Sequence, residues 1–86
     1  MLDRMIARVR DEALRAGERY GEPRSTHESL GVLLEEFDEL KSAIHANAMA
    51  SISMEAIQVA AVALRLAVEC ERAILGETDF RRRSVP

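Results

Sequence analysis

The sequence predicts an all-α protein: a helical bundle of three main helices plus a short tail, completed by oligomerisation. Three observations support this. Apolar residues recur at three- and four-residue steps along most of the 86 residues, which is the period of an amphipathic helix. Only four glycines and two prolines interrupt that pattern, so we expect long helices. A chain this short buries little surface alone, yet 48% of its residues are apolar, so copies are expected to share a core.

The first two helices have clear boundaries in the sequence. The first is predicted over residues 2–20 and ends at the Gly-Glu-Pro segment 21–23, because glycine and proline break helices. Ser25 then starts a capping-box pattern, with Glu28 three residues later. The second helix is therefore expected to begin after Ser25 and to run to about Ala46.

The third helix has a weaker start and a clearer end. Residues 48–52 form a poorly marked break, in which Ser51 or Ser53 is the candidate N-terminal cap. The helix is expected to continue to Leu75, and Gly76 is a natural residue for its C-terminus. Together the three helices would make one domain.

The C-terminal segment 77–86 is predicted to be a polar tail. It is either disordered or anchored to a neighbouring subunit through Phe80. It also holds the only basic run, Arg81 to Arg83, for which a solvated chain end is the favoured interpretation. The net charge is −3 and the isoelectric point about 5.4, so we expect no nucleic-acid partner.

Localisation is predicted from the cysteine content and the third helix. Cys70 is the only cysteine, which excludes an internal disulfide and fits a reducing cytoplasm. Its apolar surroundings favour packing over nucleophilic catalysis. The apolar stretch after Ile57 is interrupted by Arg65 and Glu69, and we take it to be too short and too charged for a membrane span. We therefore expect a cytoplasmic protein with no membrane partner.

The most unusual segment is an acidic cluster on the second predicted helix. Glu35, Glu36, Asp38 and Glu39 put four acids into five residues. Only Asp38 has a basic residue, Lys41, at helical spacing. Like charges at that spacing cost about 0.2–0.5 kcal/mol per pair. The cluster is either a solvated surface stripe or a cation site, and the lack of basic partners favours the cation.

A second pair of oxygen ligands follows on the third predicted helix. Glu55 and Gln58 have the same spacing of three as Glu36 and Glu39, so each pair projects from one helix face. Two such pairs facing each other would form an oxygen-lined pocket for a hard divalent cation. Mg²⁺ is held in this way against a phosphate-bearing substrate.

Polar residues of the third helix form one narrow strip on an otherwise apolar surface: Glu55, Gln58, Arg65, Glu69 and Arg72. The strip is either an exposed edge whose ion pairs contribute little, or it faces the carboxylates of the second helix across a cleft. In the second interpretation, Arg65 or Arg72 would neutralise a substrate phosphate.

Two segments resemble a known family. Residues 33–40 read Leu-Leu-Glu-Glu-Phe-Asp-Glu-Leu and residues 55–62 read Glu-Ala-Ile-Gln-Val-Ala-Ala-Val. They are similar to the motifs of the MazG-like all-α nucleoside triphosphate pyrophosphohydrolases. The resemblance implies that residues 1–76 form one MazG-like helical domain. It also implies a homodimer or homotetramer that converts a nucleoside triphosphate substrate to the monophosphate and pyrophosphate with Mg²⁺, for which Mn²⁺ is a substitute.

The same resemblance implies roles for individual residues. Glu36, Glu39 and Glu55 would be metal ligands, and Glu35 would be a ligand or the catalytic base that orients the attacking water. Gln58 stands where the family usually has aspartate, so it would offer the metal an uncharged amide oxygen. The alternative is a non-catalytic helical dimer or interaction module that keeps the fold without productive metal binding. Gln58 and the short chain favour that alternative, whereas the uncompensated acidic cluster favours the enzyme.

Overall fold

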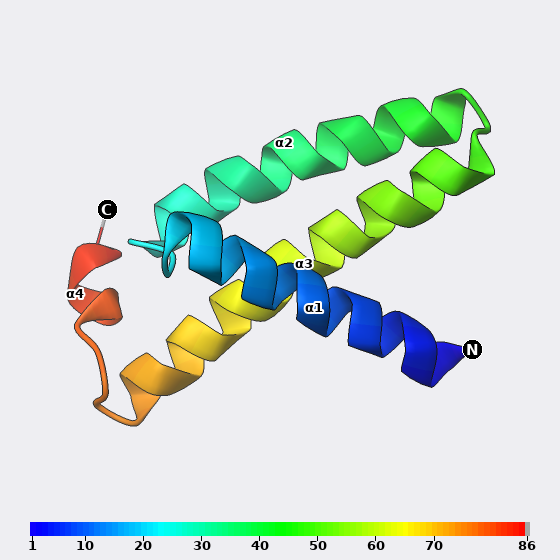
Figure 1. Ribbon diagram of the computed structural model, residues 1–86. Coiled ribbons are helices and arrows are strands. Elements are labelled where there is room, and N and C mark those ends of the chain that lie inside the picture. The colour runs from blue at the N-terminus through cyan, green and yellow to red at the C-terminus, as the bar shows by residue number, and fades with distance from the viewer. Residues whose placement is uncertain (86) are drawn as a thin grey trace.

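The structure is a computed structural model that describes residues 1–85, and all the regular elements in that range are helices, so the all-α class is confirmed. They are α1 (Leu2–Tyr20), α2 (Thr26–His45), α3 (Met49–Ile74) and the short α4 (Phe80–Arg83). α2 and α3 form an antiparallel hairpin, and α1 lies across α3 (Figure 1). α4 packs on α3 and returns the chain towards the start of α2.

The start of α2 is capped much as the sequence predicts. The Ser25 hydroxyl accepts a hydrogen bond from the backbone N–H of Glu28 at 3.1 Å. The Glu28 carboxylate reaches back to the backbone N–H of Arg24 at 3.0 Å, one residue earlier than in the usual capping box. These bonds satisfy donors that the helix itself leaves unpaired and hold the connection between α1 and α2 in place.

The turn between α2 and α3 is tighter than predicted, because α3 begins at Met49 and neither Ser51 nor Ser53 caps it. Asn47 adopts the left-handed conformation with φ 53°. The N–H of Asn47 donates to the carbonyl of Ile44, and the N–H of Ala48 donates to the carbonyl of Ala43. This pair of bonds is a Schellman motif, and it reverses the chain without a serine cap.

α3 ends where the sequence predicts, and the tail then folds onto its own chain. Gly76 has φ 75°, the conformation that glycine adopts most readily after a helix. Phe80 is only 1% exposed. The Ser84 hydroxyl accepts from the backbone N–H of Thr26 at 2.9 Å, which ties the end of the chain to the start of α2. Through residue 85, the tail is thus neither free nor in need of a neighbour to anchor Phe80.

The single chain has a very small apolar core. Its buried apolar residues are Ala43, Ile57, Ala61 and Phe80. Many large apolar side chains on α2 and α3 are exposed instead, among them Leu34, Phe37, Ile44, Leu64, Val68 and Ile74. Exposed apolar surface of this extent marks an interaction site more often than ordinary solvent exposure.

α3 begins before either serine that the sequence offered as a cap and runs without a break to Ile74. Its 26 residues are long and apolar enough to cross a membrane, judged by length and composition alone, so the expectation that this helix is no membrane span stays a prediction. The core helix of a globular protein has the same features. α3 contacts α1, α2 and α4, and its Arg65 and Glu69 both have hydrogen-bond partners within the chain.

Candidate metal centre

Three of the acids that the motifs single out meet between α2 and α3. Glu36 and Glu39 lie almost one turn apart on α2, and Glu55 lies near the start of α3. One carboxylate oxygen from each residue lies within 4.8 Å of the other two. The tight turn at Asn47 sets the register of the hairpin, and this register brings Glu55 opposite the α2 pair.

Two oxygens of this triad, defined as Glu36, Glu39 and Glu55, are buried without a hydrogen-bond partner. They are one Oε2 atom each on Glu36 and Glu55. Buried polar atoms without partners are rare, because each loses its hydration without compensation. Here two of them lie in one three-carboxylate cluster, which makes the cluster a candidate cation site.

Electrostatics also disfavour three bare charges at this point. Burial raises the pKa of the Glu36 carboxyl above its ordinary value, and the charges of Glu39 and Glu55 raise it further. Burial, followed by the neighbouring Glu39 carboxylate, also raises the pKa of Glu55. Both shifts have the sign expected for carboxylates that are crowded together and partly removed from water. A hard divalent ion offers a counter-charge, and its preferred ligands are carboxylate oxygens.

A cavity of about 770 Å³ opens beside the triad, enclosed by α1, α2, α3 and the connection between α1 and α2. This volume is in the range of small-molecule sites. Four residues from the sequence prediction line it: Glu35 and Glu36 from α2, and Gln58 and Arg65 from α3. The cavity therefore has the proposed metal ligand Glu36 in its wall.

Gln58 faces a residue that sequence analysis did not select. Its amide lies beside the Glu12 carboxylate on α1, and that contact, followed by Arg15, lowers the pKa of Glu12. Glu12 and Gln58 both line the cavity. Gln58 is thus at the cavity wall but is not one of the three residues whose oxygens converge. Nothing in the α1 sequence pointed to Glu12, since the motifs lie on α2 and α3.

The structure separates the two arginines that were predicted to bind phosphate. Arg65 lines the cavity and donates to the carbonyl of Gly21. Arg72 is not among the cavity residues. It donates to Glu69 at 2.9 Å and lies 3.3 Å from Glu22 and 3.9 Å from Glu77.

The position of Arg72 follows from the burial of its partner. Glu69 is only 3% exposed, and a buried carboxylate is costly unless it is paired. Arg72 pairs with it and at the same time reaches the segments on either side of the helical hairpin. Arg72 is thus engaged in ion pairs, and it is Arg65 that lines the cavity.

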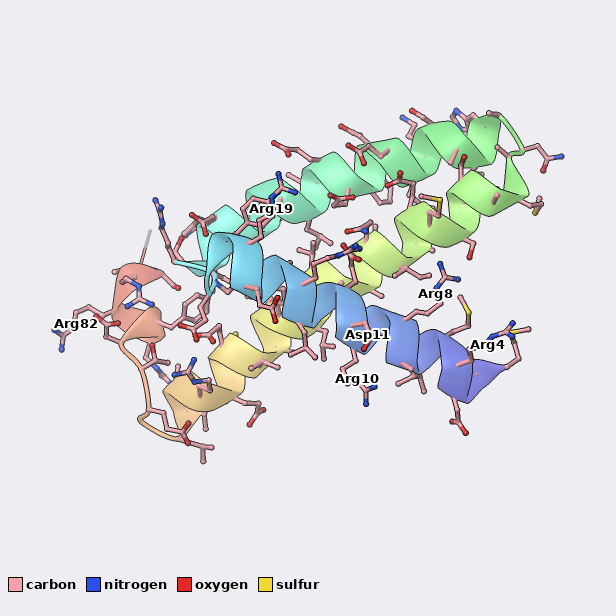
Figure 2. All side chains as sticks on the ribbon, in the orientation of Figure 1. Arg4, Arg8, Arg10, Asp11, Arg19 and Arg82 are labelled. Carbon is pink, nitrogen blue, oxygen red and sulfur yellow. The ribbon has the colours of Figure 1, made fainter. Side chains whose placement is uncertain are left out.

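Basic residues of α1 complete the cavity wall. Arg15 and Arg19 line it together with Arg24 from the following connection. Figure 2 shows Arg19 projecting from α1 towards α2, whereas Arg10 projects from the other side of the same helix. Sequence analysis did not identify Arg15 or Arg19, because α1 contains arginines on several faces and its own pattern does not show which face meets α2.

Comparison with known proteins adds no family assignment. No family model matches the chain, and no curated protein or solved structure matches it.

Proposed function

We propose that this chain is a Mg²⁺-dependent nucleotide pyrophosphohydrolase, which converts a nucleoside triphosphate to the monophosphate and pyrophosphate. The observation that carries the proposal is the triad. Its three carboxylates converge within 4.8 Å, and two of its buried oxygens have no hydrogen-bond partner. Mn²⁺ would substitute, because it prefers the same oxygen ligands.

Each residue of the proposed centre has a distinct role. Glu36, Glu39 and Glu55 would hold the metal, whereas Gln58, predicted from the sequence as a fourth ligand, lies in the cavity wall against Glu12. Bound Mg²⁺ would supply positive charge at the phosphoryl oxygens and lower the pKa of a coordinated water. Glu35 lies in the same wall as Glu36, where its carboxylate would orient the attacking water and accept a proton from it.

The resemblance of residues 33–40 and 55–62 to MazG-like motifs supports the same proposal, and the exposed apolar surface supports an oligomer. Phe37 and Ile44 on α2 are 54% and 51% exposed. We propose that a second copy of the chain covers this surface in a homodimer or homotetramer, completing the helical bundle. The proposed location is the cytoplasm, with α3 as the central helix of the assembly instead of a membrane span.

The proposal is tested by incubating the protein with each common nucleoside triphosphate and deoxynucleoside triphosphate, with Mg²⁺ or Mn²⁺, and measuring pyrophosphate release. We expect turnover of at least one nucleotide, and none with EDTA. Glu39→Gln should abolish that turnover, because it removes one of three charged ligands. Asp38→Asn is the matched control: it removes the same charge from the next position of α2, outside the triad.

Two results would contradict the proposal. One is a wild-type protein that releases no pyrophosphate from any nucleotide and whose melting temperature is insensitive to Mg²⁺. The other is a Glu39→Gln variant with the same turnover as the wild type, which would place the chemistry elsewhere.

The alternative function is a non-catalytic helical interaction module. One observation favours it: the Gln58 amide lies against Glu12 instead of converging with the triad. The same assays separate the two proposals, since the module would form the helical dimer but release no pyrophosphate.

A further inference from the structure

The α2 wall of the cavity beside the triad is acidic, whereas the α1 wall carries both signs, because Glu12 lies there beside the arginines. Glu35 and Glu36 line it from α2, whereas Arg15 and Arg19 line it from α1. With a cation on the triad, the α2 wall would attract the oxygens of an anion. An anion that extends across the cavity would then need a second cationic contact on the α1 side.

Most guanidinium groups around the cavity already have an oxygen partner. Arg15 is paired with Glu12, and Arg24 lies 3.8 Å from Glu28. Arg65 donates to the carbonyl of Gly21. These three arginines therefore hold parts of the wall together and are less available to a ligand.

Arg19 is the exception. Within residues 1–85, no carboxylate lies within ion-pair distance of it. Its guanidinium instead lies 5.3 Å from the centre of the Tyr20 ring, an arrangement that is attractive but leaves the N–H donors at the edge of the group unused. Figure 2 shows the side chain directed from α1 towards α2, the side on which the cavity lies.

We infer that Arg19 binds the part of the substrate's phosphate chain that extends beyond the proposed metal-bound phosphate. A phosphoanhydride chain carries negative charge on each successive phosphate, so one end can meet the metal while the next phosphates reach a guanidinium. Arginine suits this role because its planar fork donates two parallel hydrogen bonds to phosphate oxygens. The inference rests on the proposed function for the identity of the substrate.

The test uses inorganic tripolyphosphate as the probe, titrated calorimetrically into the full chain with Mg²⁺ and, separately, with EDTA. Arg19→Gln should weaken binding roughly tenfold or more, as expected for loss of a charge-assisted contact. Arg19→Lys keeps the charge without the fork, so its affinity should be intermediate. Arg10→Gln, on the other side of α1, is the matched control and should bind like the wild type.

The outcomes separate this inference from the proposed function. If Arg19→Gln binds tripolyphosphate as tightly as the wild type in both media, the inference is overturned, even if the enzyme hydrolyses nucleotides. Absence of binding by the wild type in both media overturns it as well. If Arg19→Gln weakens binding but no nucleotide is hydrolysed, the phosphate-binding role stands and the proposed reaction does not. In an active enzyme, Arg19→Gln should raise KM while its melting temperature stays that of the wild type.

Discussion

Neutralising Glu36 should raise the stability of the metal-free protein. It should also make the melting temperature insensitive to Mg²⁺. The triad oxygens lie within 4.8 Å of one another, and two unit charges at that upper limit repel by about 0.9 kcal/mol in water and by about 3.5 kcal/mol at an effective dielectric constant of ~20. Glu36→Gln removes two of the three repulsive pairs in the triad. Solvent screens part of this repulsion, because Glu39 is exposed. We therefore expect the free energy of unfolding without metal to rise by about 1–2 kcal/mol.

The same substitution should abolish stabilisation by metal. A ligand present at about 100 times its dissociation constant stabilises the native state by about 2.7 kcal/mol. In a domain of this size, 1 kcal/mol shifts the melting temperature by about 4–8 °C. Saturating Mg²⁺ should thus raise the melting temperature of the wild type by about 10–20 °C, but should leave that of Glu36→Gln nearly unchanged.

The measurement is thermal unfolding followed by circular dichroism, at one protein concentration, with EDTA and across a Mg²⁺ titration. Asp38→Asn removes a charge from the exposed side of α2 and should behave as the wild type within about 0.5 kcal/mol. If Glu36→Gln and Asp38→Asn give the same melting temperatures in both media, the triad is neither strained nor a metal site, and the reasoning is refuted.

Three further outcomes are expected. The pKa values of Glu36 and Glu55 are raised in the folded state, so the native protein binds more protons than the unfolded chain above the ordinary carboxyl range. With EDTA present, the free energy of unfolding of Glu36→Gln should therefore exceed that of the wild type by a margin that grows as pH rises from about 4.5 to 7. A margin that does not change with pH would contradict the assigned burial of Glu36 and its repulsion by neighbouring carboxylates. Phe37→Asp should convert an oligomer into 9.6 kDa chains in light scattering after size exclusion, whereas Arg10→Asp should not; a monomeric wild type would remove the proposed interface. Phe80→Ala should lower the free energy of unfolding by about 3–5 kcal/mol in urea denaturation, because the side chain is 1% exposed, and a loss below about 1 kcal/mol would mean that α4 does not stay docked.

The helix boundaries show where local chemistry is enough for prediction. The Ser25 cap and the glycine at position 76 are both observed, because each is a signal between residues a few positions apart. The predicted start of α3 was wrong because no capping side chain marks it. Asn47 takes a left-handed conformation and Ala48 precedes the helix without a side-chain cap, so no serine marked the boundary.

In the candidate site, too, features set by nearby residues were predicted, whereas most features set by tertiary packing were not. The spacing of Glu36 and Glu39 on α2 was legible in the sequence, and the convergence of Glu55 with them was expected from the paired motifs. Arg65 and Arg72 lay on one predicted strip of the third helix, so the sequence did not show which of them reaches the proposed phosphate site. The structure places Arg65 at the cavity and Arg72 against the buried Glu69, because a buried carboxylate requires a cationic partner.

By itself, the sequence determined the helical class, most helix ends and the residues that share a face of each helix, since all of these follow from the 3.6-residue period and from short-range hydrogen bonds. Only the tertiary structure decided which faces meet. It brought Arg19 and Glu12 of α1 to a cavity beside Glu36, although neither belongs to a motif. It also folded Phe80 onto α3 instead of leaving it for a neighbour. Such pairings depend on how helices cross and which side chains compete for burial, and the pattern of any single helix contains neither.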